Sequence, residues 1–216
     1  MDSLFSPSVL DEQVKGRASR RRERDAYFSP LFALDALLER QIVCGFTLLD
    51  PCCGDGRMAF ALRKRFARIT VNDLLLPQFD ALTDTPECRI QVLNRDATIA
   101  EPPLWGPPCD WVITNPPWNL ASEIAQLALR HSKNVALLVR LTFLEATEKR
   151  QWLVNRPPQS VVVLPRISFD GTGKTDSCVS AWLVWGPWVA PGLRIVRKQD
   201  IRQQVIRFGD SSQVIL

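Results

Sequence analysis

Short β-rich runs alternate with helical segments from residue 29 onward, and this alternation constrains the fold more than any other feature of the chain. The order strand, helix, strand is typical of βαβ units, in which parallel strands form a sheet covered by helices on both faces. The sequence therefore predicts an α/β fold with a mostly parallel sheet. Seven strands are expected, over residues 46–50, 68–72, 89–93, 110–114, 134–140, 160–164 and 178–185.

Four helices are expected around these strands. Ser29 and Pro30 form a typical helix start, an N-cap followed by a proline in the first turn, and predict a helix over LFALDALLER. The segments 121–131 and 145–154 are expected to be crossover helices. Apolar spacing predicts a further helix over 57–66, whose buried face is Met58, Ala61, Leu62 and Phe66.

The last two predicted strands are joined by residues 165–177, whose glycines and polar residues favour a loop over a helix. We therefore expect this final pair to be antiparallel. The loop contains GTGKT (171–175), which is not a phosphate-binding loop, because Ser168 stands where that pattern needs glycine and a strand follows. Residues 194–216 are expected to add one or two short strands.

The length of 216 residues favours a single domain over residues 26–216, with no separate domain for recognising a target. A basic arm over residues 1–25 precedes it, in which KGRASRRRERD (15–25) holds six Lys or Arg against two acids. Such an arm can contact phosphates without reading sequence, or it can be a solvated tail. The sequence leaves both interpretations open.

No apolar run reaches the roughly 18 residues of a membrane span. The N-terminus, MDSLFSPSVLDEQ, lacks the apolar stretch of a secretory signal, so a soluble cytoplasmic protein is expected. His131 is the only histidine, and the cysteines form no CxxC or Cys/His cluster, which argues against a metal site and a disulfide framework. The cysteines are Cys44, Cys52, Cys53, Cys88, Cys109 and Cys178.

The segment DPCCGDG (50–56) follows the first predicted strand, where glycines let the backbone approach a ligand closely. Gly54 and Gly56 alone are a weak signal, because many such turns use glycine without binding anything. Asp73 strengthens the signal for a ligand site, because this residue follows the second strand and lies 23 residues after Asp50 (73 − 50). This is near the spacing of about 20 at which an acid meets ribose hydroxyls in dinucleotide folds.

Acidic residues at this edge indicate the charge of the ligand. Asp50 and Asp55 would repel a pyrophosphate, and they are compatible with a cationic or zwitterionic nucleoside. Asp96, just beyond the third strand, could accept a hydrogen bond from an adenine amino group, or it could be a plain turn aspartate.

The segment VITNPPWNL (112–120) ends the fourth strand at a stiff corner. Pro116 and Pro117 supply no backbone N–H and bias the preceding residues away from the helical region. Asn115 and Trp118 are thereby held at the two ends of the corner. We interpret it as an active site for methylating an amino group, with a proline turn and a core-facing tryptophan as the alternative.

Together, DPCCGDG, Asp73, Asp96 and NPPW resemble the class I S-adenosylmethionine-dependent methyltransferases, and most closely the DNA adenine-N6 methyltransferases of the small phage and prophage type. The resemblance covers residues 26–186. It implies a three-layer Rossmann-like fold with a seven-stranded sheet whose last strand is antiparallel. The catalytic signature of that family, Asn/Asp-Pro-Pro-aromatic, falls on Asn115, Pro116, Pro117 and Trp118.

The resemblance also implies S-adenosylmethionine as cofactor. YFSP (27–30) resembles the segment that covers the methionine end of the cofactor in these enzymes. The chain departs from the family at Cys52 and Cys53, whose side chains are expected to line the pocket rather than react. The implied cofactor-binding residues are Tyr27, Phe28, Pro30, Asp50, Pro51, Cys52, Gly54, Gly56, Asp73, Asp96 and Asn115.

The implied activity is methyl transfer to the exocyclic N6 of adenine in DNA. The Asn115 side-chain oxygen and the Pro116 carbonyl would accept the two N–H bonds of that amino group, and Trp118 would stack on the flipped base. Related corners methylate RNA bases and protein glutamine, and an idle subunit that binds nucleic acid or activates a partner is a third possibility. A dimer or a separate partner could supply the recognition surface that the chain lacks.

Arg166 and Lys174 are further candidates for substrate contacts, because their loop and NPPW are expected at the same sheet edge. An exposed loop without contacts is the alternative. The remaining tryptophans are expected to be packing residues: Trp105, Trp111, Trp152, Trp182, Trp185 and Trp188.

Overall fold

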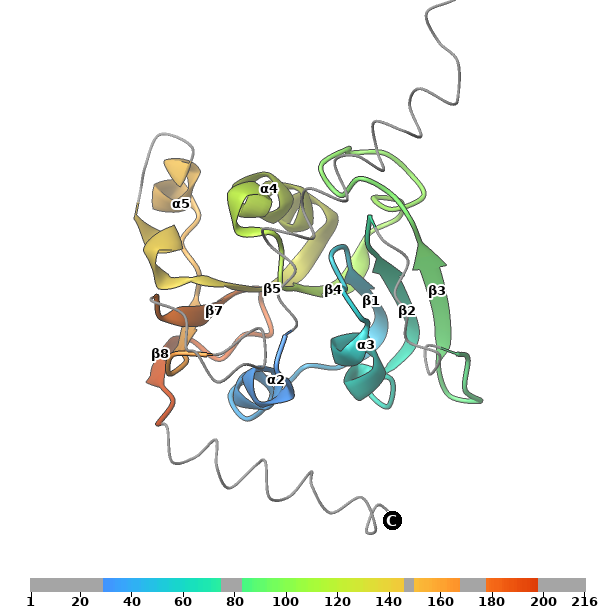
Figure 1. The fold of residues 1–216 in the computed structure, drawn as a ribbon, viewed down its shortest axis with the longest axis horizontal. Helices are drawn as coiled ribbons and strands as arrows, with labels where there is room; N and C mark the ends of the chain where they lie inside the picture. The colour runs from blue at the N-terminus through green and yellow to red at the C-terminus, as the bar shows by residue number, and fades with distance from the viewer. Residues whose placement is uncertain (1–28, 75–82, 146–149, 168–177, 198–216) are drawn as a thin grey trace, which may run out of the picture.

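The computed structural model describes residues 29–74, 83–145, 150–167 and 178–197, and these residues form one mixed sheet of eight strands (Figure 1). The strand order is β3-β2-β1-β4-β5-β7-β6-β8. The strands are β1 (Gly45–Asp50), β2 (Phe66–Asn72), β3 (Arg89–Leu93), β4 (Cys109–Thr114), β5 (Ser132–Arg140), β6 (Ser160–Val163), β7 (Ser180–Trp185) and β8 (Gly192–Ile195).

The directions of the strands confirm the predicted α/β sheet. β3, β2, β1, β4 and β5 are parallel neighbours, and β7 lies antiparallel between β5 and β6. The antiparallel final pair expected from the loop over 165–177 is therefore confirmed. The strand count of seven is exceeded by β8, which pairs in parallel with β6.

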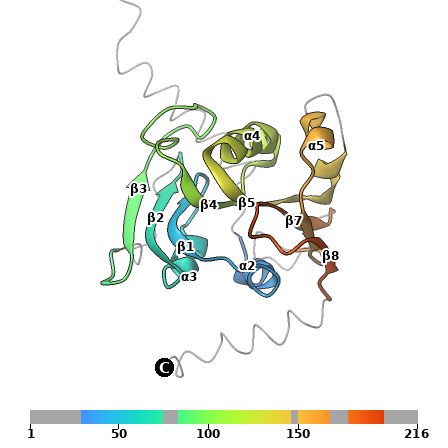
Figure 2. The same ribbon diagram turned by 180° about the vertical axis from the view of Figure 1, so that it is seen from behind.

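Helices cover both faces of the sheet, as Figures 1 and 2 show. α2 (Leu31–Leu38) and α3 (Arg57–Leu62) lie on one face, and α4 (Ala121–His131) and α5 (Trp152–Asn155) lie on the other. Two short 3-10 helices, η1 (Trp118–Leu120) and η2 (Leu141–Leu144), follow the carboxyl ends of β4 and β5.

The core has two halves because the central strands are buried on both faces. In β5, Ala136 and Leu138 join the cluster under α2 and α3, while Val135, Leu137 and Val139 join the cluster under α4. A strand covered on both sides carries a nearly continuous apolar run rather than an alternating one. This explains why the apolar runs in the sequence predicted the positions of the central strands well.

Two helix predictions need correction at their ends. Ser29 is not the N-cap of α2: Pro30 occupies that position, and no side chain caps the helix. The helix expected over 57–66 ends at Leu62, because Phe66 pairs with Gly45 in the ladder between β1 and β2. The buried face of α3 is consequently Met58, Ala59 and Leu62, whereas Ala61 is exposed.

The helix expected over 145–154 is also different in the described residues. α5, four residues long, is the α-helical part of the described residues there, and Arg150 before it is in a 3-10 conformation. Residues 146–149 lie outside the described part of the chain. α5 ends at Asn155, two residues before Pro157, and a proline cannot continue a helix hydrogen-bond ladder.

Several predicted features lie outside the described residues: the basic arm over 1–25, Tyr27, Phe28, the GTGKT segment and Lys174. Within the residues that the structure describes, no helix is long and apolar enough to cross a membrane.

Candidate active site

The carboxyl ends of β1, β2, β3 and β4 lie at one edge of the sheet. Asp50 is in register with Val71, Asn72 with Leu93, and the ladder between β1 and β4 is parallel as well. The structure therefore places Asp50, Asp73, Asp96 and Asn115, predicted from four separate segments, along the same edge. Ligands of open α/β sheets bind at such an edge.

The loop between β1 and α3 is a tight turn that needs its two glycines. Gly54 has φ 58° and Gly56 has φ 80°, both in the left-handed region. The loop is tied to the end of β2, because the Gly54 N–H donates to Asp73 Oδ2 (2.9 Å) and the Cys53 N–H donates to the Asn72 carbonyl (2.8 Å). One carboxylate oxygen of Asp73 is thus engaged in shaping the loop.

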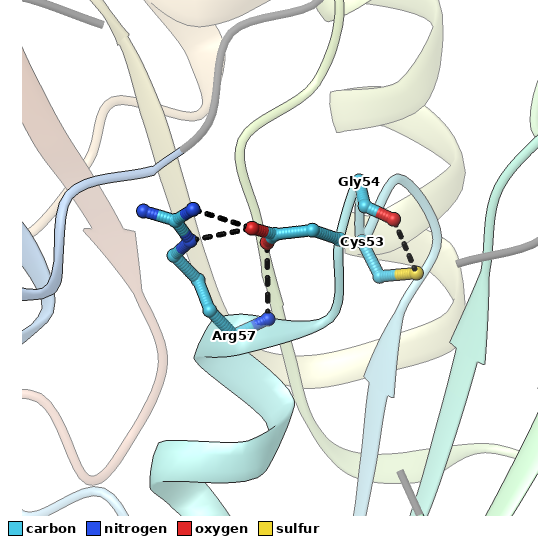
Figure 3. Close-up of polar contacts among 4 residues, drawn as sticks. Cys53, Gly54 and Arg57 are labelled. Carbon is cyan, nitrogen blue, oxygen red and sulfur yellow. Dashed lines mark hydrogen bonds and ion pairs between the residues drawn. The ribbon is translucent and has the colours of Figure 1, made fainter. Parts of the chain in front are cut away.

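Asp55 has a different role from the one expected. Its carboxylate accepts from the backbone N–H of Arg57 (3.2 Å) and from Arg57 Nε (2.7 Å), and it forms an ion pair with that guanidinium (Figure 3). The negative charge of Asp55 is therefore largely offset by its own neighbour. Asp50 and Asp73 remain as the acids that decide the charge of this end of the site.

Asp50 is buried, with 2% of its surface exposed, and its Oδ1 accepts from the Cys52 N–H at 3.2 Å. Burial, and to a smaller extent the nearby charge of Asp73, raise the pKa of this carboxyl to about 7. The Thr114 hydroxyl and the Cys52 N–H act in the opposite direction on this pKa, although Thr114 Oγ1 forms no hydrogen bond within normal geometry. A cation placed beside Asp50 would favour its ionised form.

Asn72 holds three loops of this edge together, and sequence reasoning did not identify it. Its Nδ2 donates to the carbonyls of Pro51 (2.9 Å) and Arg95 (3.0 Å), and its Oδ1 accepts from the Arg95 N–H (2.8 Å). The side chain is 1% exposed. The only signal in the sequence is an amide at the end of a predicted strand directly before Asp73, and such a position does not reveal these partners.

Asp96 forms a turn, as one of its two interpretations expected. Its Oδ1 accepts from both the backbone N–H (2.9 Å) and the hydroxyl (2.7 Å) of Thr98. Asn94, also in this loop, donates to the carbonyls of Asp73 (2.8 Å) and Leu74 (2.7 Å). The turn bonds use only Oδ1, so Oδ2 is the oxygen of Asp96 that can face a ligand.

The NPPW corner follows β4 directly and continues into η1 and α4. Asn115 and Pro116 are buried, while Pro117 and Trp118 are partly exposed. The Leu120 N–H donates to the Pro117 carbonyl (2.9 Å), which closes the 3-10 turn. Asn115 Oδ1 is a buried acceptor that receives no hydrogen bond within the described residues, although the residue makes other interactions.

Trp118 combines features of both interpretations of the corner. Part of its side chain packs against the core cluster under α2 and α3. The guanidinium carbon of Arg140, at the end of β5, lies 3.6 Å from the centre of the Trp118 ring. Sequence reasoning did not identify Arg140, because no local pattern links the end of one strand to the loop after its neighbour.

The side chains of Cys52 and Cys53, in the glycine loop, lie in different surroundings. Cys53 is buried in the cluster under α2 and α3, and burial raises the pKa of its thiol, with the charges of Asp50 and Asp73 adding to the rise. A protonated thiol is a poor nucleophile. Cys52 is partly exposed and packs toward the α4 side. All six cysteines are free, and the described residues contain no cluster suited to a metal ion.

The remaining candidates lie further from these contacts. Pro30 precedes α2, which packs on α3, the helix that follows the glycine loop. Arg166 is exposed after β6. Of the tryptophans expected to pack, Trp105, Trp111, Trp182 and Trp185 are buried and Trp152 is partly buried. Trp188 differs, since 56% of its surface is exposed.

Comparisons with known proteins show similarity of structure rather than of sequence. No protein-family model matches the chain, and no curated protein matches it. A dimethyladenosine transferase from Plasmodium falciparum has a TM-score of 0.52 and 17% identity, over 73% of this chain and 62% of that chain. The 23S rRNA methyltransferase ErmE has a TM-score of 0.53 and 15% identity, over 87% of this chain and 80% of that chain.

A modification subunit of a putative type I restriction enzyme from Vibrio vulnificus is also similar, with a TM-score of 0.52 and 12% identity. The match covers 99% of this chain and 60% of that subunit. The chain thus spans less than two thirds of both this subunit and the Plasmodium transferase. At these identities the likeness shows the fold, which is the Rossmann-like fold of class I S-adenosylmethionine-dependent methyltransferases with its antiparallel β7.

Proposed function

We propose that this protein transfers a methyl group from S-adenosylmethionine to the exocyclic N6 of adenine in DNA. The observation that carries the proposal is the position of the NPPW corner. It follows β4 at the same edge as the glycine loop of β1 and the acids after β2 and β3. A donor held by the loop and an amine held by the corner would therefore meet above adjacent strands.

The residues of the glycine-loop end fit a positively charged nucleoside better than a phosphate. Asp50 is buried and Asp73 is close enough to raise its pKa, so a cation here would relieve an unfavourable concentration of negative charge. S-adenosylmethionine carries an ammonium and a sulfonium, and when bound it supplies an electrophilic methyl group. In this proposal Gly54 and Gly56 give the backbone close access, Asp73 binds the ribose, and Asp96 binds the adenine amino group.

The other proposed contacts come from flanking residues. Pro51 and Cys52 continue the glycine loop, while Tyr27, Phe28 and Pro30 precede α2 and would cover the methionine end. Arg166 and Lys174 stay weaker candidates for contact with the substrate.

The chemistry at the corner is alignment rather than proton abstraction. The lone pair of an exocyclic amine is delocalised into the ring, which makes the amine a poor nucleophile. Asn115 Oδ1 and the Pro116 carbonyl would accept its two N–H bonds and so turn the lone pair toward the methyl group. Neither acceptor needs a shifted pKa. Trp118 would stack on the base, a contact typically worth about 1–3 kcal/mol.

The substrate is tested by offering labelled S-adenosylmethionine with unmethylated DNA, with RNA and with protein extract in parallel. The proposal expects label in DNA, recovered as N6-methyladenine by mass spectrometry of the nucleosides. Label in RNA or in protein would replace DNA by one of the alternative substrates. Cofactor binding with no transfer to any of them would favour an idle subunit.

Asn115→Ala provides the mutant arm of this experiment, and Asn119→Ala is its matched control. Asn119 lies in the same corner but its side chain is exposed. We expect at least a hundredfold loss of transfer for Asn115→Ala, of the size seen when one oriented hydrogen-bonding group is removed, about 10²–10³. Asn119→Ala should retain activity within a factor of a few.

A further inference from the structure

The strongest unexplained contact of the candidate site is the stack of Arg140 on Trp118. The guanidinium carbon lies 3.6 Å from the ring centre, within the range of about 6 Å in which a cation is attracted by an aromatic face. Each residue also makes other interactions. One face of the Trp118 ring is thereby covered by a side chain from a different strand.

Arg140 is presented by a rigid part of the sheet. It ends β5, which pairs with β4 on one side and β7 on the other, and Arg140 itself is in register with Ser180 of β7. Thr114, the last residue of β4, is in register with Leu137, and Arg140 lies three residues beyond that pair, at the carboxyl end of β5. The backbone of Arg140 is thus fixed beside the NPPW corner, while Trp118 lies in a short 3-10 turn.

Because Arg140 covers one face of the indole, a base that stacks on Trp118 without displacing the arginine has to take the opposite face. A guanidinium over one face attracts π-electron density toward itself. The electron-rich face of a stacked base is then repelled less by the other side of the ring. Arginine keeps its charge at every relevant pH, so this polarisation is permanent.

We propose that Arg140 is a positioning residue for the methyl-transfer reaction, which holds and polarises Trp118 so that the target base stacks on the opposite face of the ring. This inference rests on the proposed function, because it assigns the base to Trp118. It adds to the proposed function a stack of three groups. The cation is Arg140 of β5, the ring is Trp118 of the corner after β4, and the base belongs to the nucleic acid.

The inference is tested by steady-state kinetics on unmethylated DNA with the full chain. Arg140→Ala should raise KM for DNA about threefold to thirtyfold, the range that a cation–π contact supports. Its kcat should change less, and S-adenosylmethionine affinity measured by calorimetry should stay as in the wild type. Arg140→Lys keeps the charge but not the planar group and should recover part of the loss.

A double-mutant cycle separates positioning from a general effect on the fold. The KM effect of Arg140→Ala should disappear in a Trp118→Ala background, because the arginine acts through that ring. Arg68→Ala is the matched control: Arg68 is an exposed arginine 5.6 Å from the Phe46 ring centre, two residues after the start of β2. It should leave KM unchanged, and thermal unfolding should be alike for all variants that are compared.

Three outcomes overturn the inference. A lower KM for Arg140→Ala would mean that the arginine occupies the place of the base. An unchanged KM, or an equal effect in the Trp118→Ala background, would mean that the stack has no part in base binding. If the wild type forms no N6-methyladenine, the proposed function is wrong and this inference falls with it. If the wild type forms N6-methyladenine but the Arg140 variants have the KM of the wild type, only the inference is wrong.

Discussion

Asp50 shows how burial at the residue scale links the candidate site to the stability of the protein. Its pKa is raised from 3.8 to about 7 in the folded chain. Between about pH 4 and pH 7 the folded state therefore keeps a proton that the unfolded state loses. Its contribution to stability is complete below pH 4 and is lost as the pH rises through 7. The full loss is on the order of 4 kcal/mol.

We predict that Asp50→Asn is more stable than the wild type at pH 8 and about equally stable at pH 4, because the amide cannot ionise. The difference in free energy of unfolding should grow between these values and level off above pH 7. Urea unfolding at a series of pH values measures it. Comparison with the mutant cancels other titrating groups, such as His131, whose pKa is lowered by burial. A difference that is constant with pH would contradict the raised pKa.

Gly186 offers a second prediction at this scale. Its φ is 143°, and a Cβ there would lie 2.8 Å from Asn134 Cα and from the Lys133 carbonyl. These are backbone atoms in β5, which cannot move aside cheaply. Gly186→Ala should therefore lower the free energy of unfolding by about 3 kcal/mol or more.

Gly54→Ala is the control for the effect of a positive φ alone. Gly54 has φ 58°, and no atom lies within 4 Å of the place that an alanine Cβ would take, so only the left-handed backbone cost of about 1–2 kcal/mol applies. Chemical denaturation of both variants measures the difference. Equal losses would show that the close approach at Gly186 is relieved by movement of β5.

At the scale of the elements, Asn72 decides how the loops after β1, β2 and β3 sit relative to one another. Asn72→Ala would leave the buried carbonyl of Pro51 and the partly buried carbonyl of Arg95 without their donor, and the partly buried Arg95 N–H without its acceptor. We expect a loss of about 3 kcal/mol or more in the free energy of unfolding, since each orphaned buried group costs about 1–3 kcal/mol. Thermal or urea unfolding checks this.

Asn94→Ala is matched to this change, because Asn94 also donates two hydrogen bonds to backbone carbonyls at the same edge. Its side chain is exposed, so water can replace the lost bonds and the cost should stay below about 1 kcal/mol. A small effect of Asn72→Ala would mean that the three loops are held mainly by their strands.

The elements that the sequence predicted well are those whose pattern depends on local burial. Apolar runs such as the one in β5 located the central strands of the parallel part, because both of their faces are covered, and the β-rich run RIQVL located the exposed edge strand β3. The placement of Asp73 and Asn115 at one edge followed from parallel topology. Phe66 was misassigned, since its spacing suits a helix and only pairing with Gly45 makes it a strand residue. The contacts of Asn72 and Arg140 join distant segments and have no local pattern.

At the scale of the whole molecule, the sheet has a protected centre and exposed edges. β5 and β7 are buried along almost their full length, whereas β3 and β8 have mostly exposed or half-exposed residues. We predict that amide hydrogens of β5 and β7 exchange only by global unfolding, and that those of β3 and β8 exchange sooner by local opening.

Hydrogen exchange followed by mass spectrometry measures this order. The strands are compared within one protein, so the measurement needs no mutant. Protection of β3 equal to that of β5 would show that the sheet opens as one cooperative unit, and the edge strands would then be part of the stable core.

The direction of β8 has a consequence for how such a chain can acquire specificity. β7 is antiparallel to both β5 and β6, and β8 is parallel to β6, so β8 runs the same way as β5. Arg197, just beyond β8, therefore leaves the sheet on the same side as the NPPW corner. Under the proposed function the substrate binds on this side, so a targeting module fused directly after Arg197 would begin on the side of the sheet that holds the target base. The direction of β8 therefore makes this point of the chain a suitable place to attach a module that selects the target.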